Sequence, residues 1–481
     1  MKPEKHSSEK ANLSKADNAP LDRRLALQMG FAAALAACDV VDNNGAMTKT
    51  DALIARLNAQ GDLNAIPVWQ AGTIRAQTPP QGPLTGLLLA IKDNINTADY
   101  PTSGGTPALD GNQPGQDAPP VARLRSAGAI IAGKANMHEL SSGGTSANHL
   151  FGPARNPYDR SRVPGGSSGG VASAVAAGLV DAGIGTDTAG SVRVPASLCG
   201  VIGFRPSVGR YPADGIVPLS DSFDTPGPIA RTMADILALD AVLAGKTSSR
   251  SKQDPAPIRL GLDRQLLESA APAVRAGFEA ALDALESAGA AIVPVDLSPL
   301  KTLTSNAAAG VIDAEFPALM QAYLRDYAPH VDMAALVVQI ASPSVKQFTQ
   351  TRLEKPADAS AYAQAIGPDR AALTKAWSAL FAQHRLRAII HPTTPEAALP
   401  LHEDDHVLRG GVPTQSWFYF AYTNATSIAQ APAISLPAGA TPDGMPLAIE
   451  LMGLKGTDEA LLALANTLLP SLPKTPPPPR F

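Results

Sequence analysis

The sequence contains little of what several classes of protein require. Only two of its 481 residues are cysteine, Cys38 and Cys199, so the chain cannot build a disulfide framework. Its formal net charge is −4, so it lacks the basic excess with which proteins bind the phosphates of nucleic acids. No apolar run reaches the roughly 18 residues that a membrane-spanning helix needs. Hydrophobic residues nevertheless make up 45% of the chain, which predicts a globular α/β protein with a large core.

The first forty residues differ in composition from the rest. Residues 1–20 are polar, and we expect an unfolded extension there. Arg23-Arg24 then precede a short apolar stretch that ends at Cys38, a pattern that resembles a twin-arginine lipoprotein signal. We therefore expect export to the inner membrane with a lipid anchor at Cys38; the alternative is an alanine-rich first helix of a cytoplasmic protein. The predicted organisation is an extension or signal over 1–40, one folded domain over 45–470 and a proline-rich tail over 471–481.

A β-α-β unit is the clearest local structure in the sequence. Residues 258–262 and 291–295 have the composition of short strands. The residues between them, 273–288, carry apolar side chains at helical spacing: Val274, Phe278, Ala281, Leu282 and Leu285. Strands that alternate with helices predict an α/β fold with a largely buried sheet.

Two segments rich in glycine contain serine residues that could act in catalysis. Gly165–Gly170 holds Ser167 and a second serine between pairs of glycines, which let the backbone approach another group closely. Its Gly-x-Ser-x-Gly pattern also fits a nucleophile elbow, but an elbow follows a buried strand, and Pro157–Pro164 has the composition of a loop. Gly185–Pro195 places Ser191 after small residues whose N–H groups can converge as in an oxyanion hole.

A serine nucleophile needs a base, and Lys92 is a better candidate than any histidine. Lys92 follows the apolar run Leu87–Ile91, where burial would lower its pKa and let the neutral amine accept a proton. The alternative is a lysine that reaches solvent from the end of a strand. His402 and His406 have the spacing of metal ligands, but the acidic residues between them and the lack of a third ligand argue against a metal site.

Several motifs together resemble the amidase signature family. They are the segment Gly165–Pro206 with its GGSSGG loop and its GTDTxGSxRxPA sequence, Lys92-Asp93-Asn94, Asp224–Pro228, and Ala431–Gly439 followed by Asp443–Pro446. The resemblance runs from about residue 45 to 470, nearly the whole folded chain. It implies a single large α/β domain with a mixed, mostly buried β-sheet covered by helices. It also implies a hydrolase that cleaves carboxylic amides through an acyl-enzyme, without a cofactor or a metal.

The serine–serine–lysine triad of the family carries over to this chain residue by residue. Ser191 matches the nucleophile, Ser167 matches the bridging serine, which in the family follows a cis peptide bond, and Lys92 matches the base. The oxyanion hole matches the backbone N–H groups of Thr188, Ala189, Gly190 and Ser191. Two further positions support this loop in the family, and they match Asp187 and Arg193. The family usually has glycine where this chain has Ala189, and we expect the added Cβ to narrow the pocket or to shift the loop.

The substrate class is inferred from one branch of the family. Gly203–Pro212 and the Asp224 motif look most like the mandelamide and indoleacetamide hydrolases, which implies primary amides of aryl-acetic acids, cleaved to acid and ammonia. The aromatic residues Trp417–Phe420 could line an aryl pocket, or they could belong to the core. We expect a small-molecule amide as substrate and no nucleic-acid partner, and we leave a homodimer open. The alternatives are a peptide-amide hydrolase and the amidotransferase A subunit, which typically has Gln at the position of Val194.

Overall fold

The computed structural model describes residues 48–246, 257–355 and 357–479. The chain divides into two units, Met1–Ala52 and Leu53–Phe481, and the second contains the sheet and the residues of the candidate site. The expected signal and the lipid anchor at Cys38 lie outside the described residues, so they stay predictions, as do the domain limits 45–470. In the described ranges, no helix is both long enough and apolar enough to pass through a bilayer.

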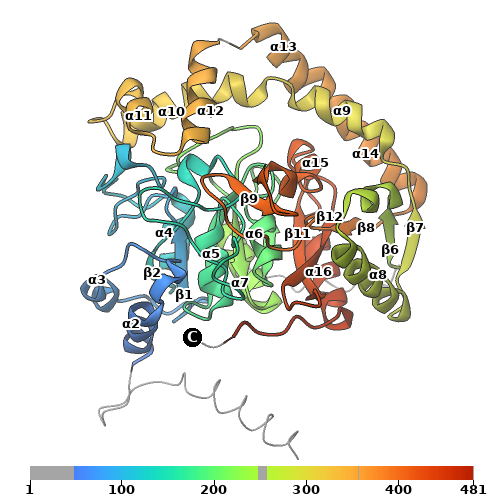
Figure 1. Cartoon of the computed structure of the whole chain (residues 1–481), viewed down its shortest axis with the longest axis horizontal. Helices are drawn as coiled ribbons and strands as arrows, with labels where there is room; N and C mark the ends of the chain where they lie inside the picture. Colours follow the sequence, from blue (N-terminus) through green and yellow to red (C-terminus); the bar gives the residue numbers. More distant parts are fainter. Residues whose placement is uncertain (1–47, 247–256, 356, 480–481) are drawn as a thin grey trace, which may run out of the picture. The chain divides into compact units, whose positions relative to one another are not determined.

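Ten strands form one mixed sheet in the described part of the chain (Figure 1). Their order along the sheet is β2-β1-β3-β5-β4-β11-β12-β8-β6-β7. Neighbours are parallel at the two ends, within β2-β1-β3 and within β8-β6-β7, and antiparallel between them. The strands of this sheet are β1 Leu88–Lys92, β2 Ile130–Ala135, β3 Ala182–Asp187, β4 Ile202–Arg205, β5 Thr225–Ala230, β6 Arg259–Leu262, β7 Ala291–Pro294, β8 Ala388–Pro392, β11 Ala433–Ala440 and β12 Pro446–Met452. The expected mixed sheet is therefore confirmed.

The helices cover the sheet and add a separate group between β7 and β8. The helices are α2 Lys49–Ala59, α3 Ala71–Ala76, α4 Pro119–Ser126, α5 Gly169–Ala176, α6 Arg193–Leu198, α7 Met233–Leu243, α8 Pro272–Ser287, α9 Ser298–Ala308, α10 Val311–Tyr327, α11 Met333–Gln339, α12 Pro343–Glu354, α13 Ala359–Gln364, α14 Arg370–His384, α15 Asn424–Ile428 and α16 Asp458–Leu468. Figure 1 shows α9 to α14 grouped along one side of the sheet. A small hairpin of β9, His406–Arg409, and β10, Val412–Gln415, precedes α15.

The predicted β-α-β unit is confirmed. β6 and β7 are parallel neighbours joined through α8, as in a crossover connection. The five apolar residues placed on one face of this helix are all buried: Val274, Phe278, Ala281, Leu282 and Leu285. The spacing of apolar residues therefore located this helix correctly because its buried face is narrow and its opposite face is polar.

The strand β1 has core on both of its faces, which explains its unbroken apolar sequence. Leu89 and Ile91 pack in one buried cluster, whereas Leu88 and Ala90 pack in another. A strand that is buried on both faces carries no polar alternation. A charged residue at the end of such a strand is consequently held away from water, and this is the position of Lys92.

Small residues allow α5 to lie close to the sheet, and this sets the loop before it. All eight residues of α5 are buried. A Cβ on Gly170 would lie 2.4 Å from the carbonyl oxygen of Asn136, and a Cβ on Gly183 would lie 2.6 Å from Val171. Glycine is therefore needed at both positions for the close approach of helix and strands. The loop that contains Ser167 enters this helix directly.

Candidate active site

Lys92 lies buried at the carboxyl end of β1. Its Nζ donates hydrogen bonds to the hydroxyl oxygens of Ser167 and Thr186, each over 2.7 Å. Burial lowers the pKa of Lys92 from 10.5 to about 7, although the carboxylates of Asp224 and Asp187 act in the opposite direction. The alternative of a lysine that reaches solvent is wrong, because the side chain has no exposed surface. Near neutral pH a large fraction of this amine is unprotonated and able to accept a proton.

The order of the strands explains why Lys92 meets residues that are distant in the sequence. β1 and β3 are parallel neighbours, so their carboxyl ends lie at the same edge of the sheet. Thr186, near the end of β3, accepts a hydrogen bond from Lys92 and another from the Asn94 side chain over 3.1 Å. Thr186 and Asn94 lie within the motifs named from the sequence, but sequence analysis assigned them no role.

Ser167 is held in a tightly packed loop. The peptide bond between Gly166 and Ser167 is cis. A Cβ on Gly166 would lie 2.8 Å from the carbonyl oxygen of Gly143, so only glycine fits at this position. The Ser168 hydroxyl donates to the carbonyl oxygen of Thr186 over 3.2 Å and ties the loop to β3. No strand leads into this loop within the described residues, so the nucleophile-elbow alternative is wrong.

Ser191 lies in the loop between β3 and α6, next to the loop of Ser167. The N–H of Ser168 donates to the carbonyl oxygen of Ser191 over 3.2 Å, so the two serine loops are joined through their backbones. Gly190 has a φ of +148°, in the region that favours glycine. In the described part of the chain, no acceptor is found for the N–H groups of Ala189, Gly190 and Ser191. These three N–H groups are therefore free to bind a substrate oxygen.

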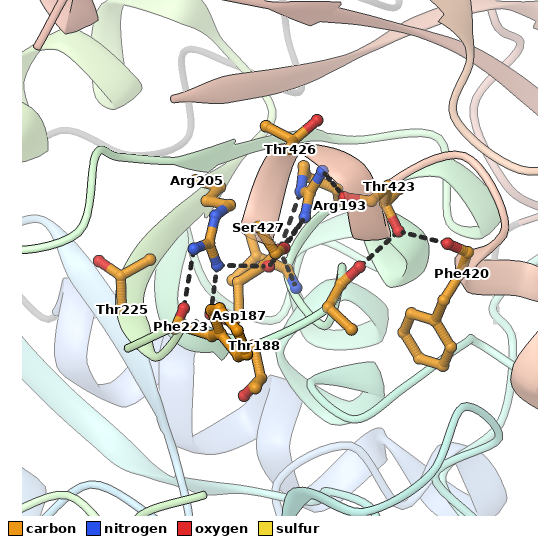
Figure 2. Close-up of polar contacts among 12 residues, drawn as sticks. Asp187, Thr188, Arg193, Arg205, Phe223, Thr225, Phe420, Thr423, Thr426 and Ser427 are labelled. Atoms are coloured by element: carbon orange, nitrogen blue, oxygen red, sulfur yellow. Dashed lines mark hydrogen bonds and ion pairs between the residues drawn. The ribbon is translucent and has the colours of Figure 1, made fainter. Parts of the chain in front are cut away.

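Four buried charges hold the two ends of this loop. Asp187 accepts hydrogen bonds from Arg193 over 3.0 Å and from Arg205 over 2.9 Å (Figure 2). Arg193 also donates to Glu450 over 2.7 Å. All four side chains are fully buried. Burial alone would raise the pKa of Asp187, but the two guanidinium groups hold it well below its usual range. Two positive and two negative charges are thus paired at the ends of the loop, and Asp187 and Arg193, the two positions that support this loop in the family, contact each other.

Thr188, at the start of the loop, is fixed from another direction. Its hydroxyl donates to Asp224 over 2.7 Å. The second oxygen of Asp224 accepts from the N–H groups of Leu219 and Ser220, over 2.7 Å and 3.0 Å. Asp224 therefore connects the loop to the segment before β5 and also acts on the pKa of Lys92. The sequence marked Asp224 only as part of a family motif.

The aromatic segment Trp417–Phe420 lies partly in the core and partly at the surface. It forms the short turn Ser416–Phe420, in which Trp417 is 44% exposed and Tyr419 is buried in the core. Phe420 is buried beside Gly190, in the loop of Ser191, and beside Gly144: its ring would lie 3.1 Å from a Cβ on Gly190 and 3.1 Å from a Cβ on Gly144. Tyr419 and Phe420 therefore belong to the core, as one alternative expected, whereas an aryl pocket at this segment stays a prediction.

Ala189 stands where the family usually has glycine, and its methyl group is accommodated by apolar neighbours. It packs against the apolar cluster that contains Val194, Leu198, Tyr419 and Phe420.

Among the residues that the structure describes, no group of three histidine, cysteine or acidic side chains is arranged to hold a metal ion.

Comparisons with known proteins agree with these motifs. The family model described as Amidase matches residues 47–462. An indoleacetamide hydrolase of Agrobacterium vitis is 38% identical over 428 residues, 87% of this chain and 92% of that protein. A mandelamide hydrolase of Pseudomonas putida is 38% identical over 418 residues, 83% of this chain and 80% of that protein. The crystal structure of the native peptide amidase from Stenotrophomonas maltophilia superposes with a TM-score of 0.73 at 28% identity, covering 94% of this chain and 97% of that one.

Proposed function

The chain belongs to the amidase family and is an amide hydrolase that acts on C–N bonds, and from this premise we propose that it cleaves a primary amide of an aryl-acetic acid through Ser191, Ser167 and Lys92. The observation that carries the proposal is the hydrogen bond of 2.7 Å between a fully buried Lys92 and Ser167. A buried amine with a pKa of about 7 can take up and return a proton at neutral pH.

The proton route begins at Ser191 and ends on Lys92. As Ser191 attacks the amide carbon, its proton passes to Ser167, and the proton of Ser167 passes to the neutral amine. The 2.7 Å contact between Lys92 and Ser167 already has the length that this second transfer needs. The Ser191 hydroxyl has no hydrogen-bond partner in the described part of the chain, so it is not committed to another group.

The oxyanion is assigned to the free N–H groups of the loop. When the carbonyl carbon becomes tetrahedral, its oxygen gains negative charge, which backbone donors fixed in advance stabilise most. Collapse of this intermediate breaks the C–N bond, and the proton returns from Lys92 through Ser167 to the departing ammonia. Water then attacks the acyl group on Ser191 by the same route and releases the carboxylic acid.

The aryl-acetic class rests on the site and on the relatives. Phe420 places an aromatic ring beside the loop of Ser191, where an aryl group of the substrate could stack. The relatives named above are an indoleacetamide and a mandelamide hydrolase. Val194 is buried in an apolar cluster next to the same loop, an environment unsuited to the Gln that is typical of the amidotransferase A subunit. This observation favours an amidase that works without a partner.

A panel of amides tests the proposal with the purified full chain and no partner protein. Phenylacetamide, indole-3-acetamide, mandelamide and propionamide are assayed for released ammonia. Burial of an aryl ring contributes about 2 kcal/mol, so kcat/KM for phenylacetamide should exceed that for propionamide by about 30-fold. Ser191→Ala should lose about 10³-fold or more in kcat on every active substrate. Unchanged ammonia release by Ser191→Ala would overturn the mechanism, whereas equal kcat/KM for propionamide would overturn only the substrate class.

Two variants of the aromatic turn examine the aryl site. Phe420→Leu should reduce the preference for phenylacetamide over propionamide several-fold, because the ring that faces the loop is removed. Phe418→Leu is the matched control, since Phe418 lies two residues away and its ring contacts Tyr419 and Arg409 instead. An equal loss of preference in both variants would show that Phe420 has no special contact with the substrate.

A further inference from the structure

Thr423, which directly precedes α15, contacts the loop of Ser191 although it lies far from it in the sequence. Its hydroxyl donates to the carbonyl oxygen of Ala189 over 2.6 Å, a contact that spans 234 residues. Its own carbonyl oxygen accepts a hydrogen bond from Arg193 over 2.9 Å. The side chain is fully buried. We propose that Thr423 is a positioning residue that sets the direction of the Gly190 N–H in the oxyanion hole; this inference rests on the proposed function.

The planarity of the peptide bond links the direction of the Ala189 carbonyl to that of the Gly190 N–H. In a trans peptide the carbonyl of one residue and the N–H of the next point in opposite directions. Thr423 holds the carbonyl of Ala189, so the N–H of Gly190 must point away from Thr423. This N–H has no acceptor in the described part of the chain. The hydroxyl of Thr423 therefore orients an oxyanion donor without touching the substrate.

The conformation of Gly190 supports the same arrangement. Its φ of +148° lets the peptide turn in a way that residues with side chains rarely adopt. A Cβ on Gly190 would lie 2.2 Å from the Thr423 hydroxyl oxygen. The space that a side chain would need is thus filled by the hydroxyl that holds the loop, and the two residues depend on each other.

Thr423 is itself held in place. Figure 2 shows its hydroxyl also directed towards the carbonyl of Phe420, over 3.4 Å, and its backbone next to Arg193. Arg193 is bonded to Asp187 at the start of the loop and to Thr423 opposite the middle of the loop. The guanidinium group therefore sets the distance between the end of β3 and the residue that orients the N–H of Gly190.

Removal of this hydroxyl should affect the transition state more than substrate binding. An oxyanion donor contributes mainly once charge has developed on the substrate oxygen, so its misalignment lowers kcat and leaves KM nearly unchanged. Thr423→Val keeps the shape of the side chain but cannot donate. We expect kcat to fall about 10- to 100-fold, because loss of a whole donor costs about 10²- to 10³-fold. KM should stay within about 3-fold of the wild-type value.

Three comparisons separate this role from a merely structural one. Thr423→Ser keeps the donor and should restore kcat to within about 3-fold of the wild type. Thr393→Val is the matched control, because it removes another buried hydroxyl, one bonded to Ser435 over 2.9 Å, and should leave kcat unchanged. Benzylboronic acid, which forms a tetrahedral anionic adduct on a serine, should bind Thr423→Val about 10-fold more weakly than it binds the wild type.

The outcomes distinguish a failure of this inference from a failure of the proposed function. If the wild type is active, Ser191→Ala is inactive and Thr423→Val has wild-type kcat, the role of Thr423 is refuted and the triad stands. A loss of kcat that Thr423→Ser does not restore, or one that Thr393→Val shares, also refutes it. If Ser191→Ala keeps wild-type activity, the proposed function itself fails. If Thr423→Val does not fold, Thr423→Cys carries the same prediction, because a thiol is a weak donor of similar size.

Discussion

The pH dependence of kcat/KM follows from the environment of Lys92. Burial lowers the pKa of this lysine from 10.5 to about 7, while Asp224 and Asp187 raise it. In the proposed mechanism the free enzyme must carry a neutral Lys92 to accept a proton, so activity should rise as pH rises through 7. With a pKa near 7, about one-tenth of the enzyme has a neutral Lys92 at pH 6 and about one-hundredth at pH 5. If Lys92 had the pKa of an ordinary lysine, the activity of the enzyme would instead keep rising up to about pH 10.

The measurement is kcat/KM for phenylacetamide between about pH 5 and pH 9.5, at constant ionic strength and with the fold checked by circular dichroism at each pH. The logarithm of kcat/KM should increase by about one unit per pH unit below pH 7 and reach a plateau above it. A profile that falls with pH, or a midpoint near 10, would refute the assignment of Lys92 as the base.

A change of one neighbouring charge gives this prediction a second test. Asp224 raises the pKa of Lys92, so Asp224→Asn should move the midpoint to a lower pH. The midpoint is compared rather than the rate, because Asp224 also binds Thr188 and the variant will be slower for that reason. The control is Asp235→Asn. Asp235 lies in the first turn of α7, where its N–H donates a hydrogen bond to the side chain of Thr232, the N-cap residue. Asp235 is not among the groups that act on the pKa of Lys92. A midpoint that moves upward in Asp224→Asn would contradict an electrostatic effect of Asp224 on Lys92.

Two further variants test the bridging serine and the buried charges. Ser167→Ala should lower kcat by about 10²- to 10⁴-fold, since the Nζ of Lys92 has only Ser167 and Thr186 as hydrogen-bond partners among the described residues. Near-normal ammonia release by this variant would show that Lys92 reaches Ser191 directly. Glu450→Gln should lower the free energy of unfolding by about 3 kcal/mol in urea titrations, because it leaves Arg193 buried with one charged partner fewer. Glu459→Gln, which breaks the exposed pair with Lys246, should change it by less than about 0.5 kcal/mol, and equal losses in the two variants would contradict the argument.

The sequence by itself determined the parts of this protein that are encoded over short stretches. The apolar run before Lys92 predicted a buried lysine, because a strand with core on both faces leaves its last residue little access to water. The apolar residues of α8 located that helix, because one narrow face of it is buried. The motifs around Ser167 and Ser191 led to the family, since glycine and serine patterns of this kind reflect local backbone requirements. By contrast, the group α9 to α14 was not located, and its helices fall in a part of the chain for which the sequence analysis identified no element.

Only the tertiary structure decided which distant residues complete the site. Glu450 lies 257 residues from Arg193, and the Thr423 hydroxyl bonds a carbonyl 234 residues away. These contacts depend on the order of the strands: β11 pairs with β4 and with β12, so the last quarter of the chain returns to the loop that contains Ser191. A hydroxyl or a carboxylate carries no mark of such a partner in its local sequence. Its role is set by the packing of elements that meet only when the whole sheet has formed.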